Sequence, residues 1–264
     1  MRRLAAPWLA LVCVLAVADS LQTPTPDLVG ARAVAMGGAY VAAGADAMSH
    51  FHNPASLASL RDVRLAGQTN VTGRDDVEAD PKGIAYGWRR WGLAWGNRIA
   101  EDPAGLADYT YLSAAAGVSS RVAVGVSGKF WRSHPSTRFQ VLGGSATYDL
   151  GVLAALAEGW RVGTRLSQVI RGARPRAGAV GVQHDAGRMS AAVQLDYVDP
   201  GGMRVRTGGE WRVGRGFAVR AGSRGTSPTL GAGWAASRAQ LDIAWTTFAD
   251  TSIVVVSMEA PLGR

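Results

Sequence analysis

MRVRTGGEWRV, residues 203–213, alternates apolar and polar side chains along most of its length. Successive side chains of an extended strand point to opposite faces, so this pattern predicts a β-strand with one apolar and one charged face. The apolar face holds Met203, Val205, Trp211 and Val213, and the charged face holds Arg204, Arg206, Glu210 and Arg212. We infer that the strand separates an apolar environment from a polar one.

The same period-two pattern recurs from about residue 63 to residue 260, in short segments separated by Gly, Pro, Asp and Ser. We count about fourteen segments, centred near residues 66, 85, 95, 113, 126, 145, 164, 181, 193, 208, 219, 232, 244 and 256. That span divided by fourteen leaves about 14 residues per segment, and a membrane strand takes ~9–11 residues plus its turn. The pattern predicts an all-β fold, an antiparallel transmembrane β-barrel of about 14 strands.

A soluble β-protein of structural role is the alternative, because its strands would alternate in the same way. Two features favour the membrane barrel. The alternating face is too rich in arginine for a packed core, and aromatic side chains fall near segment ends, as in interfacial girdles. These aromatic residues are Trp88, Trp91, Trp131, Trp160, Trp211, Phe217, Trp245 and Phe248.

The start of the chain has the pattern of a cleaved signal peptide. Arg2 and Arg3 precede an apolar run that closes on Ala16-Val17-Ala18, which is the small-x-small ending that signal peptidase needs. We expect residues 1–18 to be removed and the mature chain to be exported to the cell outer membrane. The only cysteine, Cys13, lies in this signal, so the mature chain has no thiol for a disulfide, a nucleophile or a metal. A lipoprotein anchor at Cys13 is disfavoured because the apolar run continues past it.

The chain is basic, with a formal net charge of +8. Its arginines are scattered over the segments rather than gathered in a basic run, so nucleic acid is not an expected partner. A basic barrel lumen or rim facing anionic outer-membrane lipid fits the charge at least as well.

The region from Leu28 to Leu60 differs in kind from the strands that follow. It is rich in Ala and Gly and lacks period two, and Asn53-Pro54 marks a turn. Irregular backbone is tolerated at membrane depth only where protein or water surrounds it. The lumen of the barrel is therefore the expected place for this segment.

GARAVAMGGAYVAAGADAMSHFHNPASLASL, residues 30–60, closely resembles the opening of FadL-like outer-membrane proteins and of the PorV/PorQ group. The matching residues are Gly30, Met36-Gly37-Gly38-Ala39, Asp46-Ala47 and Asn53-Pro54-Ala55. Residues 208–224 and 229–250 look like the closing hairpins of the same group. The chain departs from the pattern at His52 and Ser56, and it ends on Pro261-Leu262-Gly263-Arg264 rather than on an aromatic residue.

The resemblance implies a hatch or plug at residues 19–62, folded inside a barrel formed by residues 63–264. Because the chain is short, the resemblance leans towards PorV/PorQ, a non-enzymatic scaffold or accessory of protein secretion that meets exported proteins or a secretion system. The alternative is a FadL-like passive channel for small hydrophobic molecules. The hatch motif is Gly30, Met36, Gly37, Gly38, Asp46, Asn53 and Pro54.

The sequence contains no recognisable catalytic constellation and implies no cofactor. His50 and His52 beside Asp46 could be imagined as a metal site, but polar hatch residues that meet the lumen wall are the favoured interpretation. The charges expected in the lumen are Arg161, Arg165, Arg204, Arg206, Glu210, Arg212 and Arg220, with Asp196 and Asp242 as further partners. We expect Asp46 and Asn53 to hold the hatch against these arginines.

Overall fold

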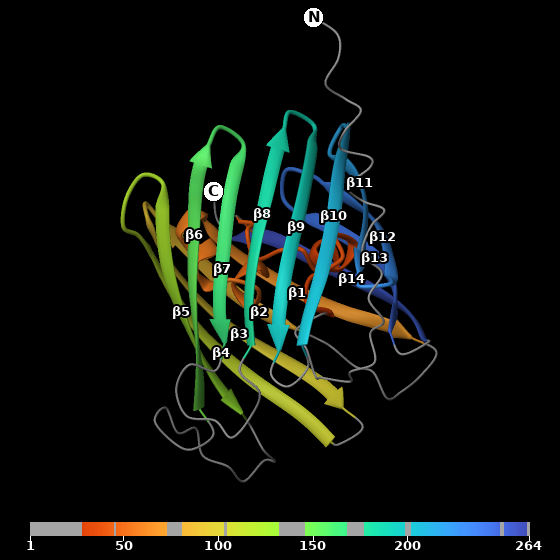
Figure 1. Cartoon of the computed structure of the whole chain (residues 1–264), viewed down its shortest axis with the longest axis horizontal. Helices are drawn as coiled ribbons and strands as arrows, with labels where there is room; N and C mark the ends of the chain where they lie inside the picture. Colours follow the sequence, from red (N-terminus) through yellow and green to blue (C-terminus); the bar gives the residue numbers. More distant parts are fainter. Residues whose placement is uncertain are drawn as a thin grey trace, which may run out of the picture.

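The computed structural model describes residues 28–44, 46–72, 81–102, 105–131, 146–167, 177–198, 202–248 and 251–262. Within these residues the chain forms a closed antiparallel barrel in which each strand pairs with its neighbours in sequence, and β1 pairs with β14 (Figure 1). The closing pair runs in register from Val63 opposite Leu262 to Thr72 opposite Ile253. The expected all-β barrel of about 14 strands is confirmed. The proposed signal peptide, including Cys13, lies outside the described residues.

The barrel has fourteen strands, and β1 begins at Val63. The strands are β1 (Val63–Thr72), β2 (Lys82–Trp88), β3 (Trp91–Asp102), β4 (Gly105–Gly117), β5 (Val122–Trp131), β6 (Ala146–Ala157), β7 (Trp160–Ser167), β8 (Ala177–Ala186), β9 (Met189–Val198), β10 (Gly202–Gly214), β11 (Phe217–Arg224), β12 (Ser227–Ala235), β13 (Gln240–Phe248) and β14 (Thr251–Leu262).

The predicted segment centre near residue 145 lies outside the described residues. The described strand nearest to it is β6, which runs from Ala146 to Ala157.

The two faces of the wall differ as the alternation predicts. In β10, Met203 and Trp211 are 67% and 53% exposed on the outer face, whereas Arg206 and Glu210 are buried on the inner face. The same division holds in β9, where Val193 and Leu195 are exposed and Gln194 and Asp196 are buried. An apolar outer band of this kind is what a lipid-facing wall requires.

The two ends of the barrel are unlike. At one end every connection between consecutive strands has two or four residues, whereas at the other end connections reach 14 residues, between β5 and β6. The start of β1 and the end of β14 lie at the first end, which we call the short-turn end. Exposed aromatic side chains gather there on the outer face, namely Trp88, Trp91, Trp211, Phe217 and Trp234. Outer-membrane barrels have aromatic girdles at their interfaces and short turns on the periplasmic side. Of the other aromatic residues singled out above, Trp131 and Phe248 have side chains outside the described residues.

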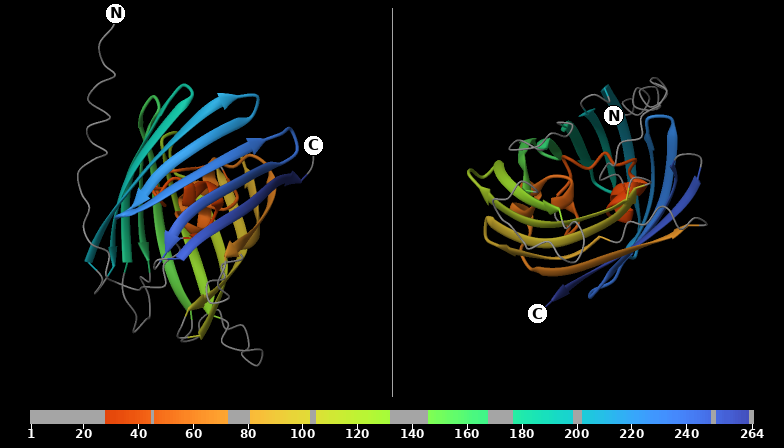
Figure 2. Two further views of the ribbon diagram at one scale, coloured as in Figure 1. Left: turned by 90° about the vertical axis from the view of Figure 1, so that its right-hand side faces the viewer. Right: turned by 90° about the horizontal axis from the view of Figure 1, so that it is seen from below.

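Residues 28–44 and 46–62, which we call the lumen segment, lie inside the ring of strands (Figure 2). The segment contains a short helix, α1 (Ala31–Ala35), and two 3-10 turns, η3 (Ser49–Phe51) and η4 (Pro54–Ser59). α1 contacts β11 to β14, and η4 contacts β2 to β6, so the segment crosses the lumen from one wall to the other. In the described part of the chain, no helix is long and apolar enough to span a membrane.

The outer apolar band leads to a test of depth. Val193 lies at the middle of β9 and Met189 at its short-turn end, and both side chains are exposed. We expect Val193→Arg to destabilise the barrel folded in lipid vesicles by about 2–4 kcal/mol, and Met189→Arg by about 0–1 kcal/mol. The difference arises because a cation is costliest at the bilayer midplane. Denaturant titration of vesicle-folded protein measures both. Equal costs at the two positions would contradict a lipid-facing wall.

Candidate functional site

Glycines of the wall let the lumen segment pack directly against strand backbone. At ten glycines of the wall, an added Cβ atom would lie within 3.0 Å of an atom of the segment. Gly163 of β7 would meet the backbone of Val41 and Ala42, and Gly208 of β10 would meet the backbone of Met36. The glycines in such contact are Gly87, Gly92, Gly96, Gly125, Gly151, Gly163, Gly181, Gly208, Gly222 and Gly231. We call this set the glycine belt.

The Met36-Gly37-Gly38 motif forms the tight turn that meets this belt. Gly37 and Gly38 have φ angles of 64° and 75°, a left-handed region that side chains disfavour. A side chain on Gly37 would also overlap the carbonyl oxygens of Thr207 and Ser223 in the wall. The amide of Gly37 donates to Thr229 Oγ1 at 3.0 Å. The motif therefore brings the backbone of the segment onto β10 and β11.

Asn53 fixes the turn at Asn53-Pro54, where η4 begins, by three hydrogen bonds. Its Nδ2 donates to the carbonyl oxygens of Val41 at 2.7 Å and Val152 at 3.0 Å, and its Oδ1 accepts from the amide of Ala55 at 3.0 Å. Asn53 thus ties two parts of the segment to each other and to β6. It also caps η4, in which Pro54 occupies the first position, where a missing amide hydrogen costs nothing.

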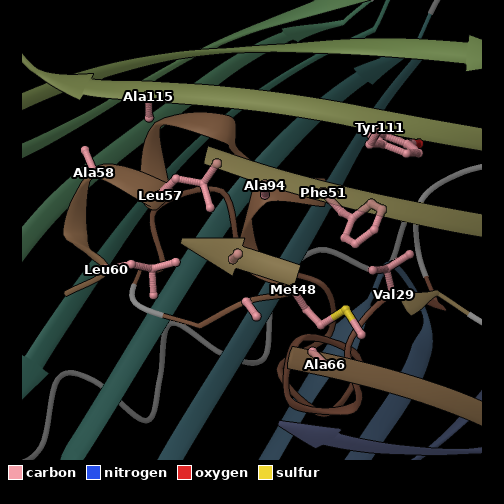
Figure 3. Packing of buried hydrophobic residues seen from close by; sticks show 12 residues of the cluster. Val29, Met48, Phe51, Leu57, Ala58, Leu60, Ala66, Ala94, Tyr111 and Ala115 are labelled. Carbon is pink, nitrogen blue, oxygen red and sulfur yellow. The ribbon is translucent and has the colours of Figure 1, made fainter. Parts of the chain in front are cut away.

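Around η3 and η4 the segment shares an apolar core with the wall. Phe51, Leu57 and Leu60 are almost fully buried. They face small wall residues, including Ala66, Ala94 and Ala115, with Tyr111 packed edge-on to Phe51 (Figure 3). Small inward residues give the large segment side chains room, so the interior is filled without enlarging the barrel.

An arginine of the segment anchors the opposite side of the lumen. Arg32 in α1 donates from Nε and Nη2 to the two carboxylate oxygens of Glu210, at 2.9 and 3.1 Å. Glu210 in β10 also accepts from Arg220 at 2.7 Å and from Arg212 at 3.1 Å. One buried carboxylate is therefore shared by three guanidinium groups, and Arg220 reaches on to Asp242 at 2.7 Å.

The expectation that Asp46 and Asn53 hold the segment against wall arginines was wrong in its partners. Asp46 accepts a hydrogen bond from Tyr40 and lies 4.0 Å from Arg32, and both partners belong to the segment itself. Burial raises the pKa of Asp46 above its usual range. The charge roles are reversed, because the segment supplies the cation, Arg32, and the wall supplies the carboxylate, Glu210.

The other predicted lumen charges have separate roles. Arg165 donates to the carbonyl oxygens of Phe51 and His52 at 3.2 and 2.9 Å, so this wall arginine binds the segment through its backbone. Arg206 pairs with Asp196, and Arg161 pairs with Asp185 at 2.6 Å, both within the wall. Arg204 lies half-buried in β10.

Amide side chains of the wall are anchors that the sequence analysis did not single out. Gln194 Oε1 accepts from the amides of Tyr40 and Val41 at 2.9 and 2.8 Å. Gln68 accepts from the amide of Gly30 and donates to the carbonyl of Leu28, both at 2.5 Å. The sequence signal for both was their position in the alternation, which places each glutamine on the inward face of its strand. A polar residue on that face can contact only the lumen.

The two histidines of the segment are hydrogen-bonded within the lumen. His50 Nδ1 lies 3.0 Å from Ser113 Oγ, and His52 Nε2 lies 2.8 Å from the carbonyl oxygen of Val29. Burial lowers the pKa of His50 to about 3, so its ring is neutral at physiological pH. Among the described residues, no group of His, Cys, Asp and Glu side chains could hold a metal ion.

A cavity of about 230 Å³ lies between the lumen segment and the wall. Its wall residues come from the strand ends next to the short turns of β7, β8, β9 and β10, so the cavity lies towards the short-turn end. The lining residues are Arg32, Met36, Tyr40, Ala43 and Gly44 of the segment and Arg161, Gln183, Ser190, Glu210 and Arg212 of the wall.

Solved structures with this architecture include a FadL homologue and two toluene transporters. The Pseudomonas aeruginosa FadL homologue is 10% identical, has a TM-score of 0.63 and matches over 91% of this chain and 99% of its own. The fold is that of FadL-type barrels. The Ralstonia pickettii toluene transporter TbuX (12% identity, TM-score 0.62, 90% and 99% covered) and the Pseudomonas putida toluene transporter TodX (11%, 0.61, 88% and 96%) share it. No protein-family model and no curated protein sequence matches the chain.

The glycine belt generates a test of how the segment is held. We expect Gly163→Leu to displace the lumen segment, because the new side chain overlaps the backbone of Val41 and Ala42 and overpacking costs about 1–3 kcal/mol. Single-channel recording in planar bilayers is expected to give larger and longer openings than the unaltered chain. Gly67→Leu is the control, since a Cβ on Gly67 meets nothing within 4 Å. Unchanged currents for Gly163→Leu would show that the segment does not close the lumen.

Asn53 provides a test that leaves the belt intact. We expect Asn53→Ala to destabilise the folded chain by about 1–3 kcal/mol, because the carbonyl oxygens of Val41 and Val152 lose a buried donor. The measurement is the shift in thermal midpoint of the folded band on a gel. Ser59→Ala, which removes one local hydrogen bond to Ser56, is expected to shift the midpoint less; an equal shift would contradict the role given to Asn53.

Proposed function

We propose that this chain is a passive outer-membrane channel for small molecules, with the lumen segment as its hatch. The supporting observation is the segment itself, which fills the lumen of a closed barrel through hydrogen bonds, one shared carboxylate and backbone contacts, with no described covalent link to the wall. Such a plug can move without unfolding the wall, because the strand ladder is complete around the barrel without it.

The FadL-like alternative has better support than the PorV/PorQ interpretation. The similar structures include the toluene transporters TbuX and TodX and a mutant of TodX described as a monoaromatic hydrocarbon channel. We extend from these proteins to the present chain the transport of small, largely hydrophobic molecules. A scaffold of protein secretion was the first expectation from the short chain, and these neighbours lend it no support.

We place the route past the hatch in the lumen. Consecutive strands pair around the described wall, with register shifts between β6 and β7 and between β10 and β11, and β1 pairs with β2 from Val63 to Gly67. A solute that enters the lumen meets the hatch and passes by displacing it or along its side, where the 230 Å³ cavity lies.

Uptake by intact cells tests this function. We expect cells that express the full chain to take up radiolabelled toluene at low concentration several-fold faster than cells without it. The chain should fractionate with the outer membrane and migrate differently on gels before and after heating. Glu210→Gln is expected to raise the uptake rate further, because it weakens the ionic attraction for Arg32.

The control for this test is Arg121→Gln, which alters an exposed turn residue between β4 and β5 and is expected to leave uptake unchanged. Equal uptake with and without the chain, although it is inserted in the outer membrane, would contradict a channel for such molecules. Repeated co-purification with exported proteins in that case would favour the secretion scaffold instead.

A further inference from the structure

The cavity beside the hatch has an uneven distribution of charge. Its lining includes three guanidinium groups, from Arg32, Arg161 and Arg212, and one carboxylate, from Glu210. That carboxylate is already shared with Arg220, which lies outside the lining. Outside the lining, Asp185 pairs with Arg161, Asp46 lies 4.0 Å from Arg32 and Asp242 pairs with Arg220. The charges around the cavity therefore balance overall, and the cations are concentrated in its lining.

The arginines retain donors for a further partner. Arg161 gives Nη2 to Asp185, and Arg212 gives Nε to Glu210 and reaches Ser190 Oγ only at 3.5 Å. A guanidinium carries five N–H donors, so these bonds use a minority of them. The side chain of Arg212 is 50% exposed, whereas those of Arg220 and Glu210 are almost fully buried. Arg212 is therefore the cation that an entering solute meets first.

A chain of hydrogen bonds connects Arg161 to Arg212 through Asp185 and Ser190. Asp185 accepts from Arg161, from Gln183 at 2.9 Å and from Ser190 at 2.6 Å. These bonds join β7, β8 and β9, and Arg212 extends the chain to β10. The hatch lines the cavity with Arg32 and also with Met36, Ala43 and the ring of Tyr40. A solute there meets guanidinium groups of the wall and, from the hatch, both Arg32 and some apolar surface.

We propose that this cavity binds a small organic acid, with its carboxylate between Arg161 and Arg212 and its apolar body against the hatch. Arginine favours carboxylates because its planar donors match the two oxygens. A volume of about 230 Å³ is below the ~300–1,000 Å³ of pockets for drug-sized ligands, so the class is short or single-ring acids rather than long acyl chains. The site deepens the proposed function, and it rests on that function only in taking the bound acid as a transported solute.

Calorimetric titration of the purified full-length chain in detergent tests the site. The probes are benzoate and benzamide, which have nearly the same shape and differ in charge. We expect benzoate to bind at one site and benzamide to bind at least tenfold more weakly. Arg212→Gln and, separately, Arg161→Gln are expected to weaken benzoate at least tenfold, and Arg121→Gln to leave it unchanged. Equal affinity for the two probes, or no benzoate binding at millimolar concentration, would overturn the proposal.

The two arginine variants and the two probes together decide whether the site exists. If Arg212→Gln does not give a heat-modifiable folded band, Arg161→Gln and the comparison of benzoate with benzamide decide the result. Benzoate affinity that stays equal to that of the unaltered chain in both folded variants also rejects the site. Benzoate binding without toluene or benzoate uptake would retain the site and reject the channel, whereas toluene uptake without benzoate binding would retain the channel and reject the site.

Discussion

The pairing of β1 with β14 is the constraint on which the rest of the structure depends. Once this pair forms, no strand of the wall keeps an open edge, and every strand can satisfy its backbone hydrogen bonds inside an apolar medium. Closure also creates an interior that water or protein must fill. The apolar outer face and the polar inner face follow from this geometry, because each strand has one side chain in two pointing each way.

The lumen segment fits this interior because many of the inward-facing wall residues that it contacts are small. Small residues and glycines occupy the inner face where the backbone of the segment approaches, as at Gly163 and Gly208. Elsewhere, inward polar side chains such as Gln194 complete the hydrogen bonds of irregular backbone. The segment is thus held by shape and by backbone bonding along its length, and a single ionic cluster at Glu210 joins it to β10. The proposed hatch function requires that these non-covalent contacts can separate while the wall stays folded.

The charged side chains on the inner face of the barrel have three different roles. Arg206 and Asp196 neutralise each other within the wall, Arg165 binds carbonyl oxygens of the segment, and the cluster around Glu210 links the segment to the wall beside a cavity. Because the barrel interior excludes much of the water, each of these interactions is less screened than on an exposed surface. Solute selectivity in such a lumen depends on the cations that keep access to water, and Arg212 is the clearest of them.

The sequence by itself determined the strands and their faces. Alternation is a local property with a period of two, so Met203 and Arg206 could be assigned to opposite faces without knowing the fold. Only the tertiary structure decided the contacts of the site: Arg32 meets Glu210, and Asn53 meets Val152. These partners are far apart in the chain, and which of the inward side chains meet depends on how the segment crosses the closed barrel.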